Sequence, residues 1–229
     1  MQIYPKVLSF GCSLIYGTDL SDDGRDLPYA RPSQLTWPAL IAKRLGFEYA
    51  TNAHGGGGNL QIMDRVMNWT YYAPDCLIIV GWTFVDRFDY SDPNGCHYNK
   101  GVDDYRTLSP VQTTDMAKNY YRDFHSEYRD KLTSLLYMKT AIDVLRTRNC
   151  RFIMTALDDT LWETRYHAPP TVIELQNYVR PYISDFEGKN FIAWSRDRGF
   201  EISPTLHPLE PAHAAAADLM WSHVEHVLS

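Results

Sequence analysis

The chain has few cysteines, and none of them stands in a metal-binding or disulfide-framework pattern. Only four occur in 229 residues, and no two form a Cys-x-x-Cys pair. This scarcity argues against a zinc site and against a small disulfide-stapled fold. We therefore expect a protein made in a reducing compartment such as the cytoplasm.

Long apolar runs and an excess of positive charge are also missing. No run approaches the roughly 20 apolar residues that span a bilayer, and residues 1–6 do not begin a secretory signal peptide. The formal net charge is −6, whereas nucleic-acid-binding domains usually carry a basic patch. We expect neither a membrane nor a nucleic acid as partner, and the oligomeric state has no readable signal.

Strand-like and helix-like segments alternate along the chain. Apolar runs predict strands over 7–10, 47–51, 76–80 and 151–155, and helical spacing predicts helices over 37–45, 60–72, 115–148 and 211–228. This alternation is typical of βαβ units. It predicts an α/β fold, a three-layer α/β/α sandwich with a parallel sheet of four or five strands.

One domain over residues 1–229 suits this length. The stretch 84–114 breaks the alternation, because it is long, irregular and contains several prolines and glycines. Loops of this length inside a compact domain are usually functional or disordered. We interpret it as an insertion that follows the third strand.

A small hydroxyl residue ends the first expected strand. The apolar run 7–10 stops at Gly11-Cys12-Ser13. Ligands of open α/β sheets bind at the carboxyl edge of the strands. Ser13 is therefore a candidate nucleophile, provided that the chain also supplies a base and donors for an oxyanion.

Four consecutive glycines follow the second expected strand, in the segment Asn-Ala-His-Gly-Gly-Gly-Gly-Asn over 52–59. Glycine lets the backbone approach a ligand and aim its N–H groups at it. Such groups ahead of a helix suit a phosphate or a tetrahedral oxyanion. A phosphate loop needs Gly-Lys-Ser/Thr, and Asn59-Leu60 stands there instead. A flexible turn is the other interpretation.

Two more polar residues stand where they can serve the same edge. Thr83 follows the third strand in Gly81-Trp82-Thr83, and its hydroxyl can donate to an oxyanion. His207 precedes a proline and the last helix. Histidine titrates near neutrality and is the commonest general base.

In this order, these segments resemble the four blocks of the SGNH (GDSL-like) hydrolases, over nearly the whole chain and with 84–114 as an insertion. The residues that carry the likeness are Gly11-x-Ser13, the loop with Asn52, Gly56 and Asn59, Gly81-x-Thr83, and His207-Pro208. The opening Ser-Phe-Gly-Cys-Ser also resembles uncharacterised, phage-encoded members of that superfamily.

The resemblance implies a flavodoxin-like fold and a serine esterase or deacetylase without cofactor or metal, acting on a carbohydrate O-acetyl group or another short acyl ester. Ser13 is the implied nucleophile and His207 its base. The implied oxyanion donors are the N–H groups of Ser13 and Gly56, with Gly57 as the nearest alternative, and the side chain of Thr83. Residues expected to line the substrate side are Asn59, Trp82, Arg87, Tyr90, Tyr98 and Tyr105.

The chain departs from the family pattern at three positions. Cys12 replaces the aspartate of Gly-Asp-Ser, Thr83 replaces an asparagine, and Pro204 replaces the aspartate of Asp-x-x-His. That last carboxylate normally orients the imidazole and stabilises its charged form. Substitutes suggested by the sequence are Glu201, Asp158 and Asp159; a backbone carbonyl or a bare Ser–His dyad are the other options.

The sequence also suggests three other interpretations. The segment 54–57 resembles the His-Gly-Gly-Gly loop of α/β-hydrolase lipases, but the Gly-x-Ser-x-Gly elbow of that fold is missing. His223-x-x-His226 lacks a third metal ligand at a convincing spacing. The departures also suit a weak or inactive SGNH-like binding or structural module, for example in a virion, and the expected location is accordingly cytoplasmic or virion-associated.

Overall fold

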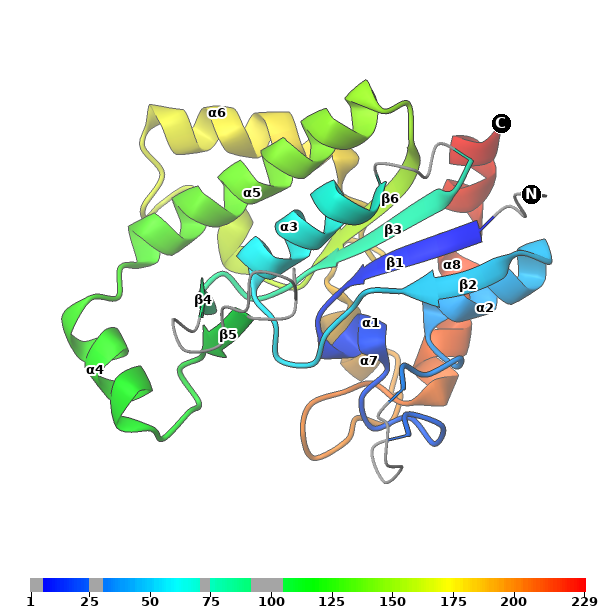
Figure 1. The fold of residues 1–229 in the computed structure, drawn as a ribbon, viewed down its shortest axis with the longest axis horizontal. Helices are drawn as coiled ribbons and strands as arrows, with labels where there is room; N and C mark the ends of the chain where they lie inside the picture. Colours follow the sequence, from blue (N-terminus) through cyan, green and yellow to red (C-terminus); the bar gives the residue numbers. More distant parts are fainter. Residues whose placement is uncertain (1–5, 25–30, 71–74, 92–104) are drawn as a thin grey trace.

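Four parallel strands form the central sheet of the computed structural model, which describes residues 6–24, 31–70, 75–91 and 105–229 (Figure 1). The strands are β1 (Lys6–Gly11), β2 (Glu48–Thr51), β3 (Leu77–Trp82) and β6 (Arg151–Ala156), in the order β2-β1-β3-β6. All three pairings are parallel. The four strands predicted from apolar runs are thus confirmed.

Helices cover both faces of this sheet, which makes the predicted three-layer sandwich (Figure 1). On one face lie α2 (Trp37–Leu45), α7 (Phe191–Asp197) and α8 (Glu210–Leu228). The other face carries α3 (Asn59–Trp69), α5 (Glu127–Thr147) and α6 (Pro170–Val179). Because both faces are covered, β3 reads as an uninterrupted apolar run: Leu77 and Ile79 enter one core cluster, and Ile78 and Val80 the other.

The single helix expected over 115–148 is in fact two helices, α4 (Asp115–Asp123) and α5. The side-chain oxygen of Ser126 accepts a hydrogen bond from the backbone N–H of Arg129 and thereby caps α5. Such a cap satisfies a donor that has no partner inside the helix and fixes where the helix begins. The sequence did not predict α6, α7, or the short helices η3 (Asp159–Trp162) and η4 (Arg180–Tyr182).

The expected insertion is more regular than predicted. It contains β4 (Phe88–Ser91) and β5 (Tyr105–Leu108), which pair antiparallel. Both strands are short, and their apolar side chains pack on α4 rather than on the main sheet. Residues 92–104, including Tyr98, lie outside the described residues. Across the described part of the chain, no helix is both long and apolar enough to cross a membrane.

Candidate active site

The turn that presents Ser13 is packed too tightly for a side chain at Gly11. Strand β1 ends at Gly11, and α1 (Ser13–Tyr16) begins two residues later. A Cβ atom at Gly11 would lie 2.5 Å from Cγ1 of Ile15 and 2.9 Å from the carbonyl oxygen of Gly81. The glycine therefore lets the chain turn sharply at the carboxyl edge of the sheet. Ser13 is the first residue of α1 and is 8% exposed.

His207 lies on the loop between α7 and α8 and contacts Ser13, although 194 residues separate the two. The Oγ hydroxyl of Ser13 lies 2.8 Å from Nε2 of the imidazole. The loop is fixed by the N–H of Ser203, which donates to the carbonyl of His207 over 2.8 Å. A serine–imidazole distance of this size is within reach of proton transfer.

Asp19 completes a chain of three side chains. Its Oδ2 lies 2.6 Å from Nδ1 of His207, so this carboxylate can orient the imidazole from the side opposite Ser13. The hydroxyl of Ser203 donates to the same oxygen over 2.6 Å, and the hydroxyl of Thr205 donates to it as well. Burial opposes ionisation of Asp19, but these hydrogen bonds outweigh it and hold the pKa of the carboxyl well below its ordinary value.

The three carboxylates suggested by the sequence lie elsewhere. Asp158 accepts a hydrogen bond from the N–H of Val85, and Asp159 accepts one from the side chain of Asn190. Glu201 is exposed. Among the described residues, the carboxylate that contacts His207 is Asp19.

A usable signal for Asp19 was present in the sequence. The polar segment 18–34 follows the short helix that begins at Ser13, so it had to leave the same edge of the sheet. Asp19 itself adopts the left-handed backbone region, at φ 73°. Aspartate and asparagine enter that region more readily than most residues.

The glycine loop forms a tight turn that leaves the N–H of Gly56 without a recorded acceptor among the described residues. The N–H of Gly57 donates to the carbonyl of His54 over 3.2 Å, and Gly56 between them has φ 79°. A positive φ at this position of a four-residue turn is the type II geometry, which favours glycine. The N–H of Gly57 is thus engaged, whereas within the described chain no acceptor is recorded for the N–H of Gly56.

Thr83, Trp82 and Asn59 are all buried. The Oγ1 of Thr83 has no hydrogen-bond partner in the described part of the chain, and the residue is 0% exposed. Its backbone N–H donates to Oδ1 of Asn59 over 2.9 Å, and Asn59 also donates to Ser134 on α5. Trp82 lies in the core with its indole N–H on the sulfur of Met154. Asn59 and Trp82 therefore link core elements, and Asn59 also lines a small cavity of about 100 Å³ together with Arg87.

Arg87 contacts the glycine loop directly, because its Nη1 donates to the carbonyl of Gly57 over 2.9 Å. The two described tyrosines of the expected substrate side lie on the β4–β5 pair instead. Tyr90 stacks on Phe88, and burial together with Asp64 of α3 raises the pKa of Tyr105. No recorded contact joins either described tyrosine to Ser13, His207 or the glycine loop.

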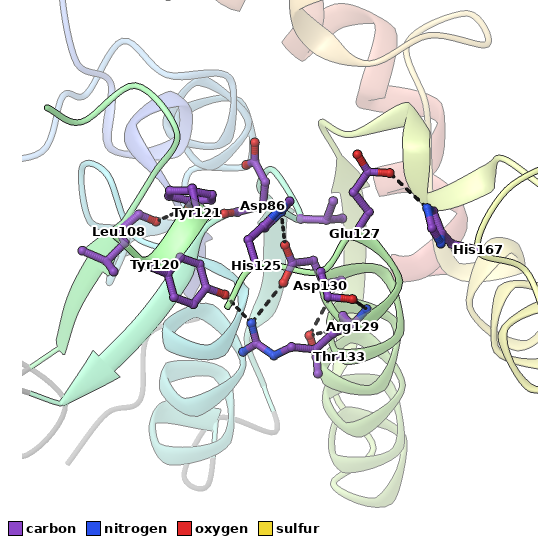
Figure 2. Close-up of polar contacts among 12 residues, drawn as sticks. Asp86, Leu108, Tyr120, Tyr121, His125, Glu127, Arg129, Asp130, Thr133 and His167 are labelled. Carbon is purple, nitrogen blue, oxygen red and sulfur yellow. Dashed lines mark hydrogen bonds and ion pairs between the residues drawn. The ribbon is translucent and has the colours of Figure 1, made fainter. Parts of the chain in front are cut away.

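A cavity of about 590 Å³ opens beyond the ends of β3 and β6. Val85 and Asp158 line it next to the sheet, and α4, α5 and the segment 160–167 form its other walls. Figure 2 shows His125 and Asp130 pointing toward each other at one side, with 2.9 Å between Nε2 and Oδ2. Burial raises the pKa of Asp130, against the opposing charges of His125 and Arg129.

Asp86 lines the same cavity, and burial raises its pKa, with a further contribution from Asp158. Over the described ranges, no group of three or more His, Cys, Asp or Glu side chains is placed to hold a metal ion.

No family model matches the sequence, and no curated protein matches it either. Solved structures do match the fold. The chain is similar to the psychrotrophic esterase EstA from Pseudoalteromonas sp., with a TM-score of 0.54 and 11% identity over 97% of this chain and 98% of that one. It is similar to TesA, with a TM-score of 0.54 and 12% identity over 97% and 99% of the two chains.

A third similar structure is the acetyl xylan esterase Est2A from Butyrivibrio proteoclasticus, with a TM-score of 0.51 and 14% identity over 100% of this chain and 66% of that one. The sheet order and the helical layers define an α/β/α sandwich of the flavodoxin-like kind. More narrowly, the fold is the one shared by the SGNH, or GDSL-like, esterases. At these low identities the likeness establishes the fold alone.

Proposed function

We propose that this protein is a serine hydrolase that cleaves an ester through a covalent acyl-enzyme. The observation that carries the proposal is the hydrogen-bonded chain Ser13–His207–Asp19. A hydroxyl, an imidazole and an ionised carboxylate in this order are the parts of an activated serine nucleophile. The shared fold with known esterases supports the same reaction class.

In the proposed reaction, Oγ of Ser13 attacks the ester carbonyl carbon while its proton passes to Nε2 of His207. Asp19, ionised at working pH because its pKa is low, stabilises the imidazolium that forms. The carbonyl oxygen becomes an oxyanion. Its collapse expels the alcohol, which takes the proton from His207. Water activated by the same imidazole then attacks the acyl-enzyme and releases the acid.

The proposed oxyanion donors are the N–H groups of Ser13 and Gly56, together with the hydroxyl of Thr83. The engaged N–H of Gly57 favours Gly56 over its neighbour. The unpartnered hydroxyl of Thr83 supports a role for this side chain, because a buried hydroxyl without a partner is costly and a ligand oxygen would relieve that cost. Since the hydroxyl is covered, substrate binding has to open a path to it.

The proposed substrate is a carbohydrate O-acetyl ester or another short acyl ester. The residues that line the cavity beside the strand ends include none of Ser13, Asp19 and His207, but its volume is in the usual range for small-ligand sites. It carries carboxyl groups, imidazoles and two tyrosines, which can hydrogen-bond to sugar hydroxyls; Figure 2 shows part of this lining. One protein of similar fold acts on acetyl xylan.

A fluorophosphonate probe tests the proposal, since it labels activated serines. The wild-type protein should be labelled, and Ser13→Ala should abolish labelling. Ser184→Ala is a matched control, because Ser184 also contacts a histidine, with its Oγ 3.4 Å from Nδ1 of His223. This change should leave labelling unaltered.

Turnover is then screened over acetylated sugars and short acyl esters. Folded wild-type protein that is neither labelled nor active on any of these esters would refute the proposal. That result would favour a binding module with an esterase fold.

A further inference from the structure

Asp89 on β4 is a buried carboxylate whose partners belong to the glycine loop and to its surroundings. It is 6% exposed. Its two oxygens accept hydrogen bonds from the backbone N–H of Gly58 over 2.9 Å and of Gln61 over 3.0 Å. The side-chain amide of Gln61 and the hydroxyl of Thr107 on β5 donate to it as well. The bonds from Gly58 and Gln61 tie the β4–β5 pair to the start of α3, and the bond from Thr107 lies within the pair.

This arrangement replaces an ordinary helix cap. The first N–H groups of a helix have no partner within it and are usually capped by a side chain just before the helix. Gly58 holds that position in α3 and has no side chain to offer. Asp89 supplies the acceptor from another part of the chain, and its negative charge also suits the helix N-terminus. A Cβ atom at Gly58 would lie 2.6 to 2.8 Å from the Asp89 carboxylate, so the loop and the carboxylate fit closely.

A second anchor lies two residues away on the same segment. Arg87 donates to the carbonyl of Gly57, next to the N–H that Asp89 holds. Figure 1 shows β4 and β5 near the start of α3. The hydrogen bonds of Asp89 and Arg87 reach the loop there. Four glycines in a row are otherwise the least restrained kind of backbone. Asp89 of β4 and Arg87 just before that strand therefore restrain the two residues that follow Gly56.

We infer that Asp89, assisted by Arg87, is a positioning residue that holds the oxyanion donor of Gly56 in place. This inference rests on the proposed function, because it assigns the β4–β5 pair a role in that same reaction. Asp89 does not touch the substrate in this assignment. It acts through Gly58 and the turn that precedes it.

The expected signature is a loss in kcat with little change in KM. An oxyanion donor acts mainly in the transition state, and a misplacement of about 1 Å in an active site can cost about 10²-fold. Asp89→Ala should lower kcat per active site by about 10²-fold. Asp89→Asn keeps one acceptor oxygen and should fall between Asp89→Ala and the wild type.

The experiment counts active sites by the burst of product in the first turnover and measures kcat and KM per counted site. Leu108→Ala is the matched control, because Leu108 is buried in the same strand pair and packs on α4. It should lower the melting temperature without changing kcat per counted site. If Asp89→Ala lowers the melting temperature but keeps the wild-type kcat per counted site, the inference is wrong and Asp89 is only structural.

Hydrogen exchange of the glycine-loop amides tests the anchoring by Asp89 independently of esterase activity. Amides in the peptide over 52–58 should exchange faster in Asp89→Ala than in the wild type or in Leu108→Ala. A wild-type protein without esterase activity refutes the proposed function and with it an oxyanion role for this loop. Unchanged exchange in Asp89→Ala overturns the anchoring itself, whether or not the wild type is active.

Discussion

Replacing Asp19 by asparagine should lower kcat by about 10³- to 10⁴-fold. The variant keeps an acceptor for the hydroxyls of Ser203 and Thr205 but removes the charge that faces the imidazole. With about 4 Å between the two charge centres and an effective dielectric constant near 20, that charge is worth about 4 kcal/mol. This corresponds to about 10³-fold, and loss of the triad carboxylate in serine proteases costs about 10⁴-fold.

The assay is hydrolysis of an activated acetyl ester, with active sites counted by the burst. Two controls isolate the contact with His207. Asp22→Asn alters the same loop, where Asp22 accepts from the N–H of Gln34, and Glu201→Gln tests a carboxylate close to His207 in sequence. Both should retain kcat within about threefold, as expected for changes that leave transition-state contacts intact. An Asp19→Asn enzyme with kcat within tenfold of the wild type would refute the assignment of Asp19.

Three further predictions address other parts of the molecule. Thr83→Val should lower kcat by about 10²-fold if the Thr83 hydroxyl binds the oxyanion. The same change should raise the free energy of unfolding by about 1 kcal/mol, because it removes a buried hydroxyl without a partner. An unchanged kcat would show that Thr83 does not bind the oxyanion. Burial lowers the pKa of His213 to about 3. Between about pH 6.5 and pH 3 the unfolded chain therefore binds more protons than the folded protein. The free energy of unfolding should fall by up to about 1.4 kcal/mol per pH unit as the pH drops through this range. Urea titrations at pH 6 and pH 5 should show this slope in the wild type and its loss in His213→Asn. Gly11→Ala should destabilise the protein by about 1–3 kcal/mol through its clash with Ile15, and thermal unfolding with an unchanged melting temperature would contradict the tight turn.

The strands and the order of the polar segments could be predicted from the sequence because both depend on local pattern. A strand covered on both faces is a short apolar run, as in β3, and a parallel sheet brings every strand end to one edge. The pairing of Ser13 with His207 followed from the resemblance to the SGNH hydrolases, because His207 lies on a loop between two helices and not at a strand end. Local pattern does not decide which side chains at the edge face solvent, and Asn59, Trp82 and Thr83 are all buried.

Contacts between distant segments were beyond local pattern. The β4–β5 pair consists of two four-residue strands whose apolar side chains meet α4, and neither strand carries a distinctive alternation. Asp89 accepts hydrogen bonds from N–H groups at the start of α3 although it lies outside that helix. The glycine at position 58 therefore gives no sign of a helix cap in the sequence. After the break between α4 and α5, the side-chain cap of α5 is a single hydroxyl, that of Ser126.

The position of Asp19 explains how His207 can be oriented by a carboxylate although position 204 is a proline. The loop that carries His207 does not supply the orienting carboxylate, but the two residues that flank Pro204 both donate hydroxyl hydrogen bonds to Asp19. The loop after Ser13 is held in turn by the N–H of Ser21, which donates to Glu210 at the start of α8 over 2.7 Å. Because the orienting charge comes from a separate segment, the imidazole is aligned only while the two loops are docked. A perturbation that separates them should therefore remove the charge and the alignment together, without any change in Ser13 or His207.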